Sequence, residues 1–215
     1  SKLALLSDIR QSESIDDVVI FDGSPISLSL ESYFEFINSP SSGTIVAFDT
    51  NITTGEDLFF VELFDAPGSV MVDGEDAVQT PITAENFLTY VNSDAYDNSF
   101  IHRSVADFVI QGGGFKTPLL PADQLGSDPS PIPSEPAIVN EPGNSNLRGT
   151  IAMAKLGGDP DSATSQWFVN LADNSANLDA QNGGFTVFAN ILDMASADAI
   201  ASLGQSNSTD FEDDN

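Results

Sequence analysis

The sequence predicts a mainly β fold with two helices. Strand-like runs, in which apolar residues cluster or alternate between turn residues, cover residues 44–50, 58–64, 150–154, 166–171 and 185–191. Apolar residues recur at helical spacing in two segments, which follow Pro81 and Ser196. With 215 residues, the chain is long enough for one domain with a substantial core and additional segments.

The amino-terminal part of the chain favours β structure. Between residues 26 and 30, isoleucine and leucine alternate with serine, which is typical of a half-buried strand. We therefore expect residues 1–42 to form an amino-terminal β extension. The runs at 44–50 and 58–64 enclose a short polar turn, and this arrangement predicts a hairpin.

The first helix is predicted to follow Pro81, which lies just ahead of it. Its apolar positions follow the spacing i, i+3, i+4, i+7 and are Ala84, Phe87, Leu88 and Val91. Thr83 is placed to cap this helix.

The second helix is predicted over residues 196–203, with Ser196 as its cap. Residues 205–215 are predicted to form an acidic tail, and the Pro/Ser/Asp-rich residues 117–147 a long loop.

The chain is strongly acidic, with 33 acidic and 6 basic residues and a formal net charge of -27. Such a field repels nucleic acid phosphates and anionic lipid, so we expect neither nucleic acid binding nor membrane insertion. The charge suits a periplasmic or secreted location or a saline habitat, although a cytoplasmic one is not excluded. Cysteine is absent, and the acidic stretch at 65–75 lacks EF-hand spacing, so no metal site is predicted.

Residues 100–115, FIHRSVADFVIQGGGF, form the most informative segment. They resemble the F-H-R-x-x-x-x-F-x-x-Q-G-G-x-F signature of cyclophilins, a family of peptidyl-prolyl cis-trans isomerases. The later blocks RGTIAMA at 148–154, SQWF at 165–168 and LD at 178–179 resemble further family elements in the same order. The resemblance covers about residues 44–204 and is most similar to the bacterial, often periplasmic, branch.

The resemblance implies a closed, antiparallel, eight-stranded barrel with two flanking helices, spanning residues 43–204. It also implies rotation of Xaa-Pro bonds in polypeptides, assisting protein folding without a cofactor. Such rotation must overcome a resonance barrier of about 18–20 kcal/mol, and no bond is made or broken. A dry slot for the proline ring and a fixed hydrogen-bond donor for the twisting amide would lower this barrier.

By the same resemblance, Arg103 is the donor, and Gln111 orients it and meets the substrate carbonyl. An always-charged planar guanidinium suits that role. The proposed pocket and rim contain Phe108, Val109, Phe168, Leu178 and Phe185. The residues implied beside the substrate backbone and in the floor of the site are Ala154, Lys155, Leu156 and Gln166.

Three positions depart from the family pattern. Asn177 stands where many cyclophilins have Trp, Phe185 where many have His, and Val109 where Met is usual. Because Trp would offer apolar area and an indole donor at the rim, we expect cyclosporin-like ligands to bind only weakly.

Several alternatives stay open at this level. Arg103 could form a structural ion pair, and the apolar residues could be ordinary core. His102, the only histidine, is expected to be packed rather than catalytic, and glycines 112–114 to form a tight bend rather than a phosphate cradle. The whole chain could be a catalytically weak proline-peptide binding module, with the amino-terminal extension as a partner surface. The strand-like amino terminus also leaves an adhesion or cell-surface domain open.

Overall fold

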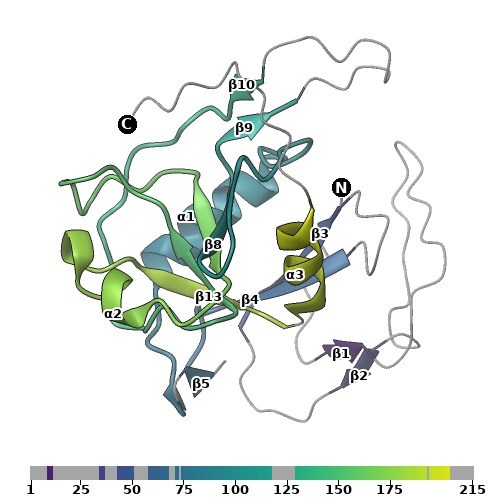
Figure 1. Cartoon of the computed structure of the whole chain (residues 1–215), viewed down its shortest axis with the longest axis horizontal. Coiled ribbons are helices and arrows are strands. Elements are labelled where there is room, and N and C mark those ends of the chain that lie inside the picture. Colours follow the sequence, from purple (N-terminus) through teal and green to yellow (C-terminus); the bar gives the residue numbers. More distant parts are fainter. Residues whose placement is uncertain are drawn as a thin grey trace.

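The computed structural model describes residues 43–50, 58–67, 71–72, 74–117, 129–192 and 194–203, and the backbone of 9–11 and 34–36. One antiparallel sheet of seven strands dominates this part of the chain (Figure 1). In sheet order its strands are β3 (Ile45–Asp49), β4 (Leu58–Leu63), β13 (Val187–Ile191), β11 (Thr150–Met153), β12 (Trp167–Asn170), β8 (Val109–Gly112) and β7 (Arg103–Val105).

The predicted hairpin is confirmed, because β3 pairs antiparallel with β4 from Ile45 opposite Glu62 to Asp49 opposite Leu58. The three later strand predictions are also confirmed and correspond to β11, β12 and β13. The polar turn predicted within this hairpin lies outside the described residues.

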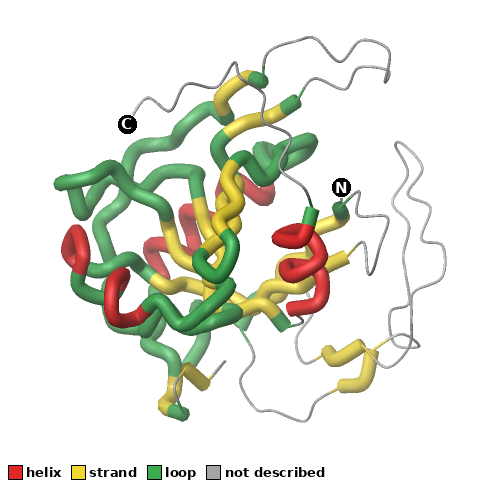
Figure 2. The backbone as a smooth tube through the Cα atoms, viewed as in Figure 1, coloured by secondary structure: helices red, strands yellow, loops and turns green. Residues whose placement is uncertain are grey.

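The sheet is strongly curled. In sheet order β12 lies four strands from β3, a separation of about 19 Å in a flat sheet with strands about 4.8 Å apart. The ring centroids of Phe48 on β3 and Trp167 on β12 are nevertheless only 5.5 Å apart. The strands therefore wrap around a common interior, as the tube in Figure 2 shows.

The two faces of this curled sheet bury different apolar clusters. The inner cluster joins side chains from every strand except β7 and includes Val46, Val61, Ile110, Ile151, Val169 and Ala189. The smaller outer cluster contains Phe64, Ala77, Val109, Ala152, Phe168, Leu178 and Val187. Because side chains alternate along a strand, β8, β11, β12 and β13 each supply both clusters.

The first helix is confirmed as α1 (Pro81–Asn92), with Ala84 and Phe87 buried in the inner cluster. The prediction for its cap is wrong, because Thr80 occupies the N-cap position and makes no side-chain cap hydrogen bond. Thr83 lies inside the helix, where its N–H and hydroxyl both donate to Glu141 Oε2 at 2.8 Å. A distant carboxylate thus caps the helix, which local sequence cannot reveal.

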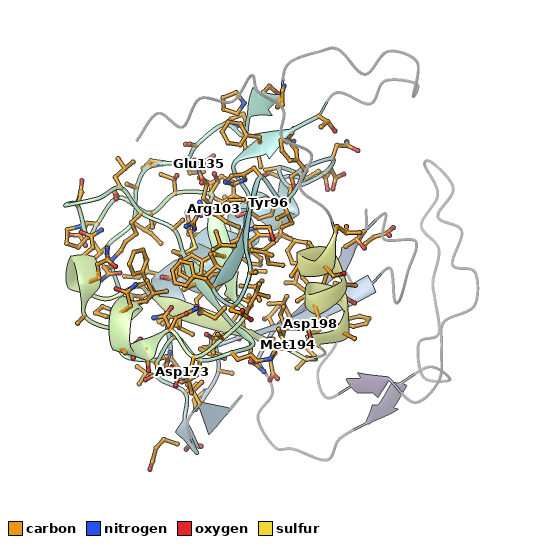
Figure 3. The ribbon with its side chains drawn as sticks, in the orientation of Figure 1. Tyr96, Arg103, Glu135, Asp173, Met194 and Asp198 are labelled. Carbon is orange, nitrogen blue, oxygen red and sulfur yellow. The ribbon has the colours of Figure 1, made fainter. Side chains whose placement is uncertain are left out.

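The second predicted helix is α3 (Met194–Ser202), which begins two residues before the prediction. Ser196 is therefore buried inside the helix rather than capping it. Ala197 joins the inner cluster, and Asp198 pairs with Arg148 at 2.7 Å. Figure 3 shows Met194 and Asp198 on this helix, apart from Arg103.

Several smaller elements were not predicted, because each is too short to produce a periodic pattern. They are α2 (Ser175–Leu178), a 3₁₀ turn (Gln181–Gly183), β5 (Met71–Val72), β6 (Glu75–Asp76), β9 (Phe115–Lys116) and β10 (Ser130–Pro131). The described part of the predicted 117–147 loop is irregular apart from β10 and an isolated bridge at Ile138.

The fold is mainly β, as predicted, but the described residues differ from a closed eight-stranded barrel with two helices. They form a seven-stranded sheet with β3 and β7 at its edges, and α2 is a third, short helix. Within residues 1–42, β1 (Ile9–Gln11) pairs with β2 (Phe34–Phe36), whereas the strand predicted at 26–30 lies outside the described residues. The predicted acidic tail also lies outside them. In the described part of the chain, no helix is long and apolar enough to cross a membrane.

Candidate active site

Three predicted site residues form one row across neighbouring strands. Gln111 on β8 lies directly opposite Arg103 on β7, and on its other side it lies opposite Phe168 on β12. Directly opposite residues in an antiparallel sheet project from the same face. The register therefore places a cation, an amide and an aromatic ring side by side on the outer face.

Polar contacts connect this row. Arg103 Nη1 donates to Gln111 Oε1 at 3.4 Å, and Gln111 Nε2 donates to Gln166 Oε1 at 2.8 Å. The guanidinium carbon of Arg103 lies 5.7 Å from the centre of the Phe108 ring. Arg103 is exposed, so most of its donors face outward and can reach a bound molecule.

The predicted pocket residues gather in the outer apolar cluster. Phe168 and Leu178 are each 5% exposed, Val109 is 1% exposed, and the ring of Phe185 meets that of Phe168 edge to face at 5.7 Å. Phe108, Ala154 and Phe185 are partly buried against the cluster. These six side chains form an apolar floor beside the guanidinium, with the half-buried rings at its margin.

Three predicted substrate-binding residues lie outside this apolar cluster, namely Gln166, Lys155 and Leu156. Leu156 is 70% exposed, and Lys155 is half-buried with its ammonium against the ring of Phe185. Main-chain bonding still ties this segment to the site, since Ala154 N donates to Gln166 O at 2.9 Å.

Sequence reasoning missed the residue that holds Phe108 in place. The carbonyl of Phe108 accepts hydrogen bonds from Leu171 N at 2.8 Å and from Asn174 Nδ2 at 3.0 Å. Asn174 also donates to Asn170 Oδ1 at 2.8 Å, and both amides are buried. The ADN run at 172–174 was visible in the sequence, but nothing there indicated that its last residue reaches back to the pocket.

His102 is half-buried and packs edge to face against Phe115 at 5.2 Å, as expected for a packed residue. Burial lowers the pKa of its imidazole, and the nearby Arg103 cation lowers it further. The environment therefore disfavours the charged imidazolium form.

Glycines 112–114 form a tight bend, as predicted. Gly113 has φ of 76°, and a Cβ there would lie 2.5 Å from Ser165 O. Only glycine fits this close approach of two backbones, which brings β8 and the 165–168 segment together beneath the site.

The described residues contain no group of three or more His, Asp or Glu side chains that could hold a metal ion. A cavity of ≈ 430 Å³ along α1, lined by residues such as Asp65 and Glu85, includes none of the predicted site residues. The site itself combines a buried apolar cluster with the cationic hydrogen-bond donor of Arg103.

Comparisons with known proteins agree with this arrangement. The family described as "Cyclophilin type peptidyl-prolyl cis-trans isomerase/CLD" matches residues 75–214. A peptidyl-prolyl cis-trans isomerase of Acinetobacter baylyi is 39% identical over 115 residues, which is 53% of this chain and 56% of the relative. Peptidyl-prolyl cis-trans isomerase A of Dickeya dadantii is 39% identical over 137 residues, covering 61% of this chain and 66% of the relative.

A crystal structure of a cyclophilin type peptidyl-prolyl cis-trans isomerase from Cryptosporidium parvum has the same fold, with a TM-score of 0.53 and 22% identity. The match covers 76% of this chain and 87% of that one. The chain belongs to the cyclophilin-type peptidyl-prolyl cis-trans isomerase family. It spans 56% and 66% of the length of the two bacterial relatives above.

Proposed function

We propose that this protein catalyses cis-trans isomerisation of Xaa-Pro bonds in polypeptides. The observation that supports this most strongly is the row of Arg103, Gln111 and Phe168 across three strands, next to a buried apolar cluster. A proline ring is apolar, and the amide nitrogen beside it becomes a hydrogen-bond acceptor only when the bond twists. The site offers an apolar surface for the proline ring and a hydrogen-bond donor for the twisted amide nitrogen.

The proposed mechanism needs no proton transfer. The proline ring rests on Phe168 and Leu178, and the guanidinium of Arg103 donates to the amide as its resonance is lost. This interaction is stronger in the twisted transition state than in the planar ground state, which is the condition for faster turnover. Gln111 holds Arg103 through its Oε1 and stays within reach of a substrate carbonyl.

The segment 154–156 is proposed to run beside the substrate backbone. Its link to Gln166 places it at the border of the apolar cluster, in support of this role. A structure of the Cryptosporidium protein was determined in the presence of the dipeptide Ala-Pro. We propose proline-containing polypeptides as partners of this chain as well.

A protease-coupled isomerisation assay on the full chain tests the function. Chymotrypsin cleaves only the trans form of an Ala-Ala-Pro-Phe anilide, so an isomerase accelerates the slow phase of cleavage. We expect that acceleration in proportion to protein concentration. Calorimetric binding of a proline peptide without any acceleration would instead identify the chain as a binding module.

We also propose that the curled sheet is completed to a closed barrel by an eighth strand that pairs with β3. Edge strands readily accept a further strand, and β3 is an edge of the sheet with Ile45 and Val46 buried. Deleting residues 1–42 and measuring amide exchange along β3 tests whether the amino-terminal extension supplies that strand. Faster exchange confined to β3 supports that source, whereas unchanged exchange excludes it.

A further inference from the structure

Lys155 is one of 6 basic residues in the chain, and its side chain lies at the rim of the site, over the ring of Phe185. Its Nζ donates to Gly184 O at 2.6 Å, to Asn182 O at 3.0 Å and to Asn140 Oδ1 at 3.1 Å. An ammonium has three donors, and here each has an acceptor within the protein. The Lys155 side chain is therefore occupied by internal contacts instead of extending toward solvent.

The loop that receives these hydrogen bonds needs support. Asn182, Gly183 and Gly184 have φ values of 52°, 77° and 77°, all in the left-handed region. Beside the main-chain hydrogen bond from Gly184 N to Gln181 O at 2.9 Å, contacts from outside the loop stabilise this conformation, which is costly for a non-glycine residue such as Asn182. Asn140 Nδ2 supplies two, donating to Gly183 O at 3.0 Å and Gly184 O at 2.9 Å. Lys155 Nζ supplies two more, to Asn182 O and Gly184 O, and Asn182 Nδ2 donates to Leu156 O at 2.9 Å.

Phe185, which follows this loop, is the residue through which Lys155 reaches the site. Lys155 Nζ lies 4.9 Å from the centre of the Phe185 ring, within the range of a cation–π contact. The same ring meets Phe168 edge to face at 5.7 Å, and Phe185 N donates to Leu178 O at 3.0 Å. The ammonium thus holds both the backbone before Phe185 and the ring itself against two pocket residues.

We propose that Lys155 is a positioning residue, which fixes Phe185 as the outer wall of the proline pocket and thereby sets substrate affinity. This inference rests on the proposed function, because it assigns the wall to a pocket for proline. A wall of this kind contacts the ring equally in the planar and twisted states of the amide. Loss of Lys155 should therefore weaken peptide binding and leave saturated turnover nearly unchanged.

The test compares Lys155→Met with Lys116→Met, which removes an equal charge from β9, where Nζ donates to Asp94 O at 3.3 Å. Calorimetry gives the dissociation constant for the Ala-Ala-Pro-Phe anilide, and the protease-coupled assay gives turnover at saturation. For Lys155→Met we expect binding about three- to tenfold weaker, with turnover within about twofold of wild type. Lys116→Met should match wild type in both.

A double-mutant cycle tests whether the effect passes through Phe185. In a Phe185→Leu background, Lys155→Met should change peptide binding by less than about twofold, because the ring on which it acts is gone. Amide exchange at residues 182–185 should also become faster in Lys155→Met. If Lys155→Met fails to fold, Lys155→Arg replaces it, since a planar guanidinium cannot match three acceptors placed around an ammonium.

The outcomes separate this inference from the proposed function. Wild-type binding by a folded Lys155→Met overturns the role of Lys155, even if the chain is an active isomerase. The role of Lys155 is also overturned if Lys155→Met weakens peptide binding equally in the wild-type and the Phe185→Leu backgrounds. If Lys155→Met binds the peptide more weakly but the wild-type protein does not accelerate isomerisation, the role of Lys155 in positioning Phe185 is supported. The proposed catalysis is then rejected.

Discussion

Arg103→Ala is the most direct perturbation of the proposed mechanism. Removing one preorganised donor to a developing charge lowers kcat by about 10² to 10³, equivalent to about 2.7–4 kcal/mol. Peptide affinity should fall far less, because the planar amide nitrogen of the ground state is a poor acceptor and gains little from the guanidinium. Arg103→Lys should also lose most activity, since an ammonium lacks the planar fork of donors.

The structure predicts a small effect of the same change on stability. Arg103 is exposed, and the substitution removes one hydrogen bond of 3.4 Å and a contact 5.7 Å from the Phe108 ring. Contacts of this kind at exposed sites contribute about 0.5–1 kcal/mol. For a chain of this size we expect Tm to fall by no more than about 4 °C.

The assay is the protease-coupled measurement of turnover, with Lys116→Ala as the control for loss of a cation elsewhere. Circular dichroism and thermal unfolding establish that each variant is folded. If folded Arg103→Ala kept more than about a third of wild-type turnover, where a hundredfold loss is expected, the donor role would be refuted. The binding-module alternative would then be the better account.

Four further predictions concern the pH dependence of turnover and of stability, ligand binding and backbone geometry. Turnover should stay flat between about pH 6 and 9, since Arg is charged throughout and no proton moves; a limb near pH 6.5 would contradict this. Folding lowers the pKa of His102, so as pH drops the unfolded state takes up a proton at His102 at a higher pH than the folded state does. Stability should therefore fall as pH drops through about 6.5. In thermal unfolding, His102→Gln should reduce this dependence of stability on pH. Asn177→Trp, at an exposed position beside the pocket, should tighten cyclosporin binding in calorimetry by about 1–3 kcal/mol, and unchanged affinity would argue against a rim role. Gly113→Ala should destabilise the fold by more than about 1 kcal/mol, whereas Gly157→Ala, with nothing within 4 Å of its Cβ position, should not; equal Tm values would refute the close-approach argument.

Much of the fold could be predicted because the relevant signals are local. Helix α1 buries one face, which imposes helical spacing on its apolar residues, whereas strands β11, β12 and β13 are buried on both faces and stand out as short apolar runs. The wrong predictions concern the helix caps, which local sequence does not determine. Glu141 caps α1 from a distant loop, so Thr83 was mistaken for the cap. Helix α3 begins before Ser196, whose small polar side chain fits a buried helical position as well as a cap.

The sequence by itself determined which residues could do the chemistry, because Arg103, Gln111 and the aromatic residues stand in a family-specific order along the chain. It could not determine their geometry. That depends on the register of β7, β8 and β12, which sets Arg103 opposite Gln111 and Gln111 opposite Phe168. It also depends on contacts between residues far apart in sequence, such as Asn174 with Phe108 and Lys155 with Gly184. Tertiary structure alone decides these contacts, because a hydrogen bond or ring contact requires that two groups meet in space, and no local pattern encodes the partner.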